Sequence, residues 1–452
     1  MKAHGGSGWS AKRSRRDFLR TGAVVATGTI AGCAPTRMTT EEPVAKATMP
    51  PSVVGANERL NVGFIGVGGQ GFNAHVAFVV EFGGEQNVVG TAVCDVWSKR
   101  REQALAALAL GESDGHADYR AVLDRNDIDA VFIGAVDHWH SRISVDALDA
   151  GKHVYCEKPM TRYLDEAFDV MEAVERTGLV FQLGSQYTTE AKWHKAAELV
   201  KAGMIGAPVL AQNSFARNVP EGEWNYDIDP ECTEATLDWG SWLGPVSERP
   251  FSADQYFRWR KYYPYCAGIL GDLLAHRIAP LLVATGNPEF PTRVACLGTR
   301  KVTPDRDVPD QTQVIVEFPS GLNFIVMGST VNEQGLAEVF RGHEATMYMG
   351  SEALELRPER PFADLADAQM FSDLQPGPSV PHHMANFYDA IRTGIVPNAN
   401  IDIAVKTQTI ISLAEMSERL GEMMHFDAAT RTVSAGSGRA MTPITYGTLE
   451  LS

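Results

Sequence analysis

Lys158 stands between Glu157 and Pro159, directly after a run, residues 153–156, whose composition predicts a buried strand. Proline lacks a backbone N–H and restricts the residue before it, so this turn can aim the lysine side chain. An ammonium group at a strand end can stabilise a developing alkoxide, and a buried lysine can itself serve as a base. A solvated surface lysine is the alternative that the residue types leave open.

Asp272 and His276 form a second candidate pair, within an apolar stretch, residues 268–284, that predicts a helix. Side chains four positions apart share one face of a helix. A carboxylate beside an imidazole can orient the ring and tune it for proton transfer near neutral pH. The spacing therefore predicts an acid–base pair, with a structural ion pair in the core as the alternative.

A glycine-rich turn follows the predicted strand 60–65 and precedes an apolar helical pattern. In this context glycines let the backbone approach a pyrophosphate, and the free N–H groups of the helix N-terminus stabilise it. The candidate cofactor contacts in the turn are Gly66, Gly68, Gly69, Gln70 and Gly71.

Asp95 ends the next predicted strand, residues 88–94. A carboxylate there accepts hydrogen bonds from the ribose hydroxyls and repels a 2′-phosphate, which favours NAD. The basic residues 99–101 follow closely and could instead hold the phosphate of NADP. The other interpretation of this basic trio is the solvated face of a helix.

The same alternation of strand and helix continues to about residue 184, which predicts a Rossmann domain over residues 58–184. In such a domain the ligand lies at the carboxyl ends of parallel strands. Further cofactor-binding candidates at those ends are Asp137, His138, His140 and Glu157. A metal site at these histidines is disfavoured, because no third ligand matches their spacing.

From residue 185 the pattern changes to extended runs that alternate apolar and polar residues, as in a sheet with one covered face. We therefore expect an α+β domain over residues 185–437, with a large, mostly antiparallel open sheet, followed by a C-terminal tail, residues 438–452. Helical runs, including 382–393, are expected to cover the sheet. The aromatic stretch 217–266 is interpreted as a packed irregular segment that also offers rings to a sugar. The substrate-binding candidates near its end are Arg258, Arg260 and Tyr263.

The first 57 residues are interpreted as an export signal followed by a flexible linker. Arg15 and Arg16 precede a short apolar run, so residues 1–32 resemble a twin-arginine signal peptide. The tetrapeptide ending at Cys33 resembles a lipobox, where the cysteine would be lipidated; ordinary cleavage by a signal peptidase is the alternative. Residues 33–57 are rich in proline and predict a flexible linker. The implied location is periplasmic, reached by the twin-arginine route, with the membrane contacted only through the signal and lipid anchor.

The composition of the chain limits which kinds of molecule it is expected to bind. The chain has 452 residues with 40 Lys and Arg against 56 Asp and Glu, a net charge of −16, which disfavours nucleic-acid binding. Six cysteines without a C-x-x-C pair argue against a disulfide framework. An open sheet face would expose apolar side chains, so we expect a homo-oligomer, a dimer or tetramer.

Taken in order, these motifs resemble the Gfo/Idh/MocA oxidoreductase family over about residues 58–435. The resemblance rests on the glycine turn, Glu157-Lys158-Pro159, the segment 184–186 with Gln186, and the Asp272/His276 pair. It implies that Lys158, Asp272 and His276 are catalytic, with His276 also touching substrate, and that Gln186 contacts the cofactor. The family often has Pro-Asn where this chain has Val136-Asp137. That departure leaves the nicotinamide contacts open.

The resemblance implies an NAD(P)-dependent oxidoreductase that acts on a secondary hydroxyl of a sugar, cyclitol or glycoside. A redox-neutral, NAD-dependent glycosidase of the same family is the first alternative, because both reactions need the same pocket. The second alternative is a non-catalytic, nucleotide-containing sugar-binding lipoprotein. NAD is the expected cofactor, and NADP remains possible.

Overall fold

The computed structural model describes residues 58–364, 367–377 and 379–449. The expected signal peptide, the lipobox with Cys33 and the linker lie outside these residues. Within the described ranges no helix has both the length and the apolar character needed to cross a bilayer.

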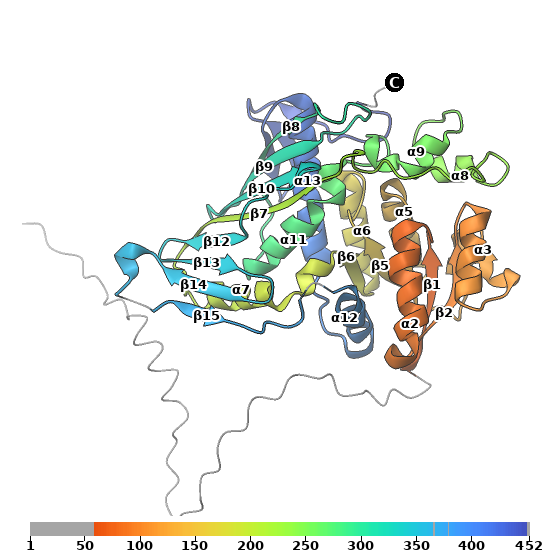
Figure 1. Ribbon diagram of the computed structural model, residues 1–452, viewed down its shortest axis with the longest axis horizontal. Helices are drawn as coiled ribbons and strands as arrows, with labels where there is room; N and C mark the ends of the chain where they lie inside the picture. Colours follow the sequence, from red (N-terminus) through yellow and green to blue (C-terminus); the bar gives the residue numbers. More distant parts are fainter. Residues whose placement is uncertain (1–57, 365–366, 378, 450–452) are drawn as a thin grey trace, which may run out of the picture.

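The first domain is built on a six-stranded parallel sheet (Figure 1). The pairing order is β3-β2-β1-β4-β5-β6. Strands β2 and β3 therefore lie on one side of β1, and β4, β5 and β6 lie on the other side. Helices cover both faces, which explains why most of the strand side chains are apolar and buried. The predicted Rossmann domain is confirmed. Its strands are β1 (Leu60–Ile65), β2 (Val88–Cys94), β3 (Gly115–His116), β4 (Ala130–Ile133), β5 (His153–Glu157) and β6 (Phe181–Gly184).

Most helices of this domain follow the strands directly: α2 (Ala77–Gln86), α3 (Ser98–Ala107), α5 (Asp137–Asp149) and α6 (Leu164–Thr177). Helix α12 (Val380–Thr393) comes from much later in the chain. Its Phe387 and Tyr388 rings pack against Phe132 of β4, with centroids 5.7 and 6.1 Å apart. The expectation that the run 382–393 covers the second sheet is therefore wrong, because its apolar face joins the core of the Rossmann domain.

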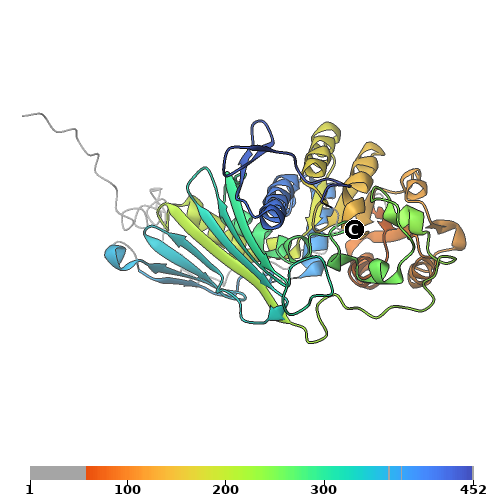
Figure 2. The same cartoon turned by 90° about the horizontal axis from the view of Figure 1, so that it is seen from above.

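The second domain is a twelve-stranded sheet that is antiparallel except where β7 (Pro208–Asn218) pairs with β10 (Asn323–Ser329). Helices α7 (Ala191–Lys201), α11 (Ala275–Ala284) and α13 (Ile401–Leu420) lie on one face, and the other face is open (Figure 2). The predicted mostly antiparallel open sheet is confirmed. The remaining strands are β8 (Arg293–Thr299), β9 (Gln311–Glu317), β11 (Val331–Asn332), β12 (Val339–Gly342), β13 (Ala345–Met349), β14 (Leu354–Pro358), β15 (Gln369–Phe371), β16 (Met424–Asp427), β17 (Thr432–Ala435) and β18 (Ala440–Met441).

The predicted helix 268–284 is two helices. Helix α10 (Ile269–Asp272) ends where the N–H groups of Leu273 and Leu274 both donate to the Ile269 carbonyl. Helix α11 starts afresh at Ala275. Asp272 and His276 therefore belong to different helices.

The segment between β7 and α10 runs back over the first domain. It contains α8 (Trp239–Leu243) and α9 (Ala253–Phe257). Leu237 forms an isolated β-bridge with Trp97, which precedes α3, and both side chains are buried in one aromatic cluster. We call residues 228–257 the strap.

Residues near the C-terminal limit of the described range are also packed. Strand β18 lies within the stretch expected to be a tail, and beyond it the Tyr446 hydroxyl lies 2.9 Å from Glu166 Oε1 and 3.0 Å from the His138 carbonyl. Residues 440–446 thus help to join the C-terminal part of the chain to α5 and α6.

Candidate active site

A cleft of about 780 Å³ lies at the carboxyl ends of the Rossmann strands, between the first domain, the strap and α11. This is a common size for a ligand pocket, and the carboxyl ends of parallel strands are where such folds bind dinucleotides. The structure brings most of the predicted site residues into its wall: Gly66, Gly68, Gly69, Gln70, Asp95, Asp137, His140, Glu157, Lys158, Gln186, Arg260, Asp272 and His276.

The glycine turn forms one end of the cleft. Gly66 has φ +80°, which side-chain-bearing residues rarely adopt. A Cβ on Gly71 would collide with the Gly66 carbonyl oxygen, so this glycine allows close packing of helix on strand rather than ligand contact. Gly71 does not line the cleft, and its predicted role as a direct contact is corrected accordingly.

Asp95 is fixed at the end of β2. Its Oδ2 accepts a hydrogen bond from the Val67 N–H (3.0 Å) and its Oδ1 from the Trp97 N–H (2.9 Å). Burial raises the pKa of Asp95, while Arg100 and the two N–H groups act against that rise. A carboxylate has further lone pairs, so Asp95 can still accept hydroxyl hydrogens from a ribose.

Lys158 and Asp272 form an ion pair at the centre of the cleft. The Lys158 ammonium donates to Asp272 Oδ1 at 2.6 Å and to the Asp272 carbonyl at 2.7 Å. Arg260 Nε donates to the same Oδ1 at 2.9 Å, and Trp224 Nε1 donates to Oδ2 at 3.1 Å. Burial alone would raise the pKa of Asp272, but Arg260 and Lys158 outweigh it and hold the pKa well below its usual range.

His276 lies beside this pair but is not hydrogen-bonded to Asp272. Its ring packs edge-on to Tyr187, with centroids 5.3 Å apart, and it makes no hydrogen bond with any described residue. Burial, followed by the positive charge of Lys158, lowers the pKa of His276 to about 3. The imidazole is therefore neutral at physiological pH. The predicted Asp272–His276 pair is wrong, because the chain breaks between α10 and α11 and Asp272 turns to Lys158.

Asp137 begins α5 and faces the same centre. It is 1% exposed, and its Oδ2 has no hydrogen-bond partner among the described residues. Burial raises the pKa of Asp137 to about 7, against the lowering effect of Arg260 and a contact with the Cys266 thiol. A protonated Asp137 can donate as well as accept a hydrogen bond here.

Glu157 precedes Lys158 and is held from the first domain. Its Oε1 lies 2.9 Å from His75 Nε2 and 3.2 Å from Gln70 Nε2. Burial would raise the pKa of Glu157, but His75, Lys158 and Gln70 together lower it to about 2. Glu157 thus ties the glycine turn to the turn that carries Lys158.

Two of the predicted histidines make backbone contacts. His138 does not line the cleft; its Nε2 bonds the Trp242 carbonyl at 2.8 Å, so the predicted cofactor contact is wrong. His140 does line the cleft, and its ring nitrogens lie 2.7 Å from the Pro159 carbonyl and 3.1 Å from the Ala135 carbonyl. His140 therefore fixes the Lys158 turn against the end of β4.

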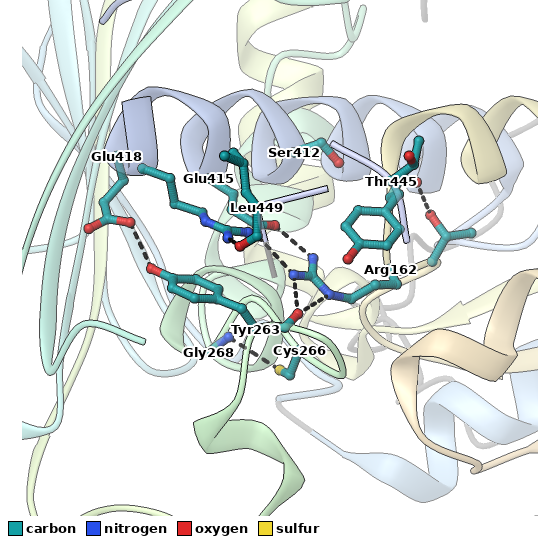
Figure 3. A network of polar contacts seen from close by, with 12 residues as sticks. Arg162, Tyr263, Cys266, Gly268, Ser412, Glu415, Glu418, Thr445 and Leu449 are labelled. Carbon is teal, nitrogen blue, oxygen red and sulfur yellow. Dashed lines mark hydrogen bonds and ion pairs between the residues drawn. The ribbon is translucent and has the colours of Figure 1, made fainter. Parts of the chain in front are cut away.

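Two of the four predicted substrate residues, Arg258 and Tyr263, lie outside the cleft. Arg258 Nε donates to the Tyr226 carbonyl (2.9 Å), and Arg258 Nη1 binds Asp254 (2.9 Å). Tyr263 belongs to a buried polar network behind the site (Figure 3). Its hydroxyl donates to Glu418, and its carbonyl accepts from Arg162, which also forms two hydrogen bonds with Glu415 of α13. Both predictions are corrected: these residues hold elements together.

Sequence reasoning missed Arg100 and its aromatic neighbours. Arg100, interpreted as a solvated helix residue or a phosphate contact, donates to the Tyr256 hydroxyl at 2.8 Å and lies over the rings of Trp97 and Phe257. Its guanidinium lies against Gly68, in the cleft wall. The sequence signal for this contact is a basic residue in α3 together with an aromatic-rich segment later in the chain. Only the fold shows that the two lie side by side.

Comparisons with known proteins agree with this geometry. The model of an oxidoreductase family with an NAD-binding Rossmann fold matches residues 60–185, and the model of its C-terminal alpha/beta domain matches residues 189–441.

Three curated relatives illustrate the range of similar sequences. An alpha-N-acetylgalactosaminidase from Shewanella oneidensis is 28% identical over 259 residues, covering 52% of this chain and 54% of that protein. A glycosyl hydrolase family 109 protein from Solibacter usitatus is 30% identical, covering 37% of each chain. A D-xylose 1-dehydrogenase (NADP(+)) from Haloferax volcanii is 32% identical, covering 31% of this chain and 43% of that protein. The matches thus span about half or less of these relatives.

Solved structures share the fold more completely. An oxidoreductase domain protein from Kribbella flavida has a TM-score of 0.62 at 20% identity, covering 81% of this chain and 99% of that one. A levoglucosan dehydrogenase in complex with NADH and L-sorbose has a TM-score of 0.62 at 18% identity, covering 81% and 98%. At this identity the likeness shows the fold alone.

Proposed function

Because the chain belongs to the Gfo/Idh/MocA oxidoreductase family, we propose that it transfers a hydride between NAD and a secondary hydroxyl of a sugar, cyclitol or glycoside. One observation carries the proposal. A buried, neutral imidazole, His276, stands beside an ammonium group, Lys158, in the wall of a cleft that also holds the glycine turn.

The residues present fit NAD. The glycine turn, the start of the helix after it and Asp95 provide a cradle for a pyrophosphate and an adenosine ribose. Asp95 supports NAD over NADP, because its carboxylate repels a 2′-phosphate and Arg100 is already engaged by Tyr256. When bound, NAD supplies the hydride acceptor for the alcohol carbon.

The remaining chemistry belongs to the protein. A hydroxyl that loses a hydride from its carbon must also lose its proton, and His276 is neutral and free to accept it. Lys158 forms an ion pair with Asp272 at 2.6 Å, and an ammonium group placed there can stabilise the developing alkoxide. Asp272 and Arg260 position this ammonium group.

Replacing the two groups tests the division of roles. His276→Ala and Lys158→Met should each lower kcat by about 10²-fold or more, the usual contribution of a positioned proton acceptor or charge. Retention of bound NAD should stay close to that of the wild type. The measurement is NADH formation on a sugar panel, alongside nucleotide content.

Matched controls are His382→Ala and Lys195→Met, both outside the cleft on α12 and α7. Turnover that survives in Lys158→Met on the true substrate would support the non-catalytic, sugar-binding alternative instead.

The redox-neutral glycosidase remains the second candidate, since the Shewanella oneidensis relative is named as an alpha-N-acetylgalactosaminidase. A neutral imidazole and a fixed cation would serve its oxidation and re-reduction steps equally well. The two candidates differ in the net change of the cofactor.

We further propose that the protein works in the periplasm after export by the twin-arginine route, tethered through a lipid on Cys33. Support comes from the arginine pair and the lipobox-like tetrapeptide in the sequence. Fractionation of cells expressing the full chain should place it in the membrane, and Cys33→Ala should release it to the periplasm. A wild-type protein found in the cytoplasm would contradict this.

A further inference from the structure

Arg260 lines the cleft, and the two Nη atoms of its guanidinium group have no hydrogen-bond partner among the described residues. Its guanidinium lies over the Trp259 ring, 4.1 Å from the centroid, and only its Nε is hydrogen-bonded, to Asp272 Oδ1. The other Asp272 oxygen is taken by Trp224, so the usual two-point contact between arginine and carboxylate does not form. Neither Nη atom forms a hydrogen bond with a described residue, although the side chain is only 20% exposed.

The charges around this guanidinium group are unbalanced. Lys158 and Arg260 both contact Asp272, so three charges in contact carry a net charge of +1. Asp137 lies near both cations but contacts neither of them, and because burial raises its pKa to about 7 its carboxyl group offsets this charge only in part at neutral pH. The nearby Arg217 is already paired with Glu223 at 2.6 Å. On the cofactor side Glu157 is occupied by His75 and Gln70, so it does not compensate Arg260.

We propose that the substrate carries a carboxylate, as a uronic acid does, and that the two free Nη groups of Arg260 bind it. A planar pair of N–H donors matches the two oxygens of a carboxylate. One uncompensated positive charge suits a monoanion better than a phosphate dianion. The inference rests on the proposed function, because it assumes that the reacting hydroxyl lies at Lys158 and His276.

The geometry is compatible with one sugar ring. Arg260 and Lys158 contact the same Asp272 oxygen, so the anion site and the alkoxide site are neighbours. A ring bearing a carboxylate on one carbon and the reacting hydroxyl on another can reach both. The fixed stack on Trp259 keeps the guanidinium edge oriented before substrate arrives.

The test uses the NAD-loaded protein and matched sugar pairs: galacturonate with galactose, glucuronate with glucose, and the corresponding sugar 6-phosphates. Binding is measured by calorimetry and reaction by NADH formation. The wild type should bind at least one uronate at least tenfold more tightly than its neutral partner, equivalent to about 1.4 kcal/mol. Arg260→Gln should abolish this preference, and Arg260→Lys should retain part of it.

Arg258→Gln is the matched control, two residues earlier and outside the cleft, and it should keep the preference. Retention of NAD in each variant verifies that the site has folded. Equal binding of uronate and neutral sugar by the wild type overturns the inference, as does a preference that persists in Arg260→Gln. Tighter binding of the sugar phosphates also overturns it.

The outcomes separate this inference from the proposed function. If neutral sugars reduce NAD and uronates bind no better, hydride transfer stands and the carboxylate site fails. If uronates bind through Arg260 but no NADH forms, the carboxylate site stands and hydride transfer fails.

Discussion

Asp137 is a buried carboxyl group beside two cations, and it is not bound to either of them. Burial raises its pKa to about 7, so the folded protein binds a proton there more tightly than the unfolded chain does. Between pH 4 and 7 the unfolded chain has released this proton and the folded protein has not. Stability from this group is therefore lost as pH rises through that window.

Asp137→Asn should remove this dependence. Relative to the wild type, the variant should gain stability as pH rises from 4 to 8, by up to about 4 kcal/mol, at about 1.4 kcal/mol for each unit of pKa shift. Urea unfolding of both proteins across this range provides the measurement. A difference that stays constant from pH 4 to 8 would contradict a raised pKa.

At the residue scale, the sequence identified chemical groups better than it identified partners. Lys158, Asp272 and His276 were recognisable from their neighbours, and the cleft contains all three. The predicted contact between Asp272 and His276 was wrong, because the periodicity of an apolar run does not reveal that the helix breaks between two leucines. Tyr263 and Arg260 are similar as sequence candidates, yet only the fold shows that the first binds Glu418 and the second lines the cleft.

At the element scale, the strap closes the side of the cleft that is lined by Asp95 and Arg100, where the adenosine of NAD is expected to bind. Tyr256 is 3% exposed and joins Arg100 and Trp97, whereas Lys99 binds Asp229 and Glu231 through side chains that are open to solvent. Exposed ion pairs contribute little, while buried aromatic packing contributes more. The strap is therefore expected to slow nucleotide release mainly through its aromatic contacts.

Tyr256→Ala should raise the rate of NAD dissociation about tenfold, which corresponds to about 1.4 kcal/mol of lost packing. Lys99→Gln, the control at the other strap contact, should change the rate less than about twofold. The rates are measured by diluting each protein and following over time the amount of nucleotide that stays bound. Equal rates in all three proteins would show that the strap does not retain the cofactor.

Helices and strands were predictable where the local hydrophobic pattern of the sequence determines them. The alternation of buried strands and helices indicated the Rossmann domain, and period-two alternation indicated the open sheet. Helix α12 was assigned to the wrong domain, because an amphipathic pattern shows that a face is buried but not against what. The strap has no periodic pattern, and its path over α3 depends on tertiary contacts such as the Trp97–Leu237 bridge.

At the scale of the whole molecule, the open face of the second sheet remains uncovered. It bears the apolar side chains Leu210, Leu297, Ile315, Ile325, Met327 and Tyr348. Leu297 is 74% exposed, Ile315 51% and Tyr348 39%, and a group of exposed apolar residues on one face of a sheet is typical of an interface. We propose that two copies of the chain cover this face in a homo-oligomer.

Light scattering of the mature protein at micromolar concentration should give the mass of a dimer or tetramer. Leu297→Glu should shift it toward the monomer, since it would place a charge in the apolar interface. Leu449→Glu, at an exposed position outside the strands of the sheet, should not. A wild-type monomer would contradict the proposed oligomer.

The most direct test of the central claim is the stoichiometry of cofactor reduction. Purified, NAD-containing protein is mixed with its best substrate from the panel, and NADH and sugar products are quantified in the same reaction. Hydride transfer to the cofactor as the net reaction predicts one NADH for each sugar oxidised, with NADH formation in His276→Ala slower by about 10²-fold or more. Release of an aglycone with no accumulation of NADH would contradict it and establish the redox-neutral glycosidase instead.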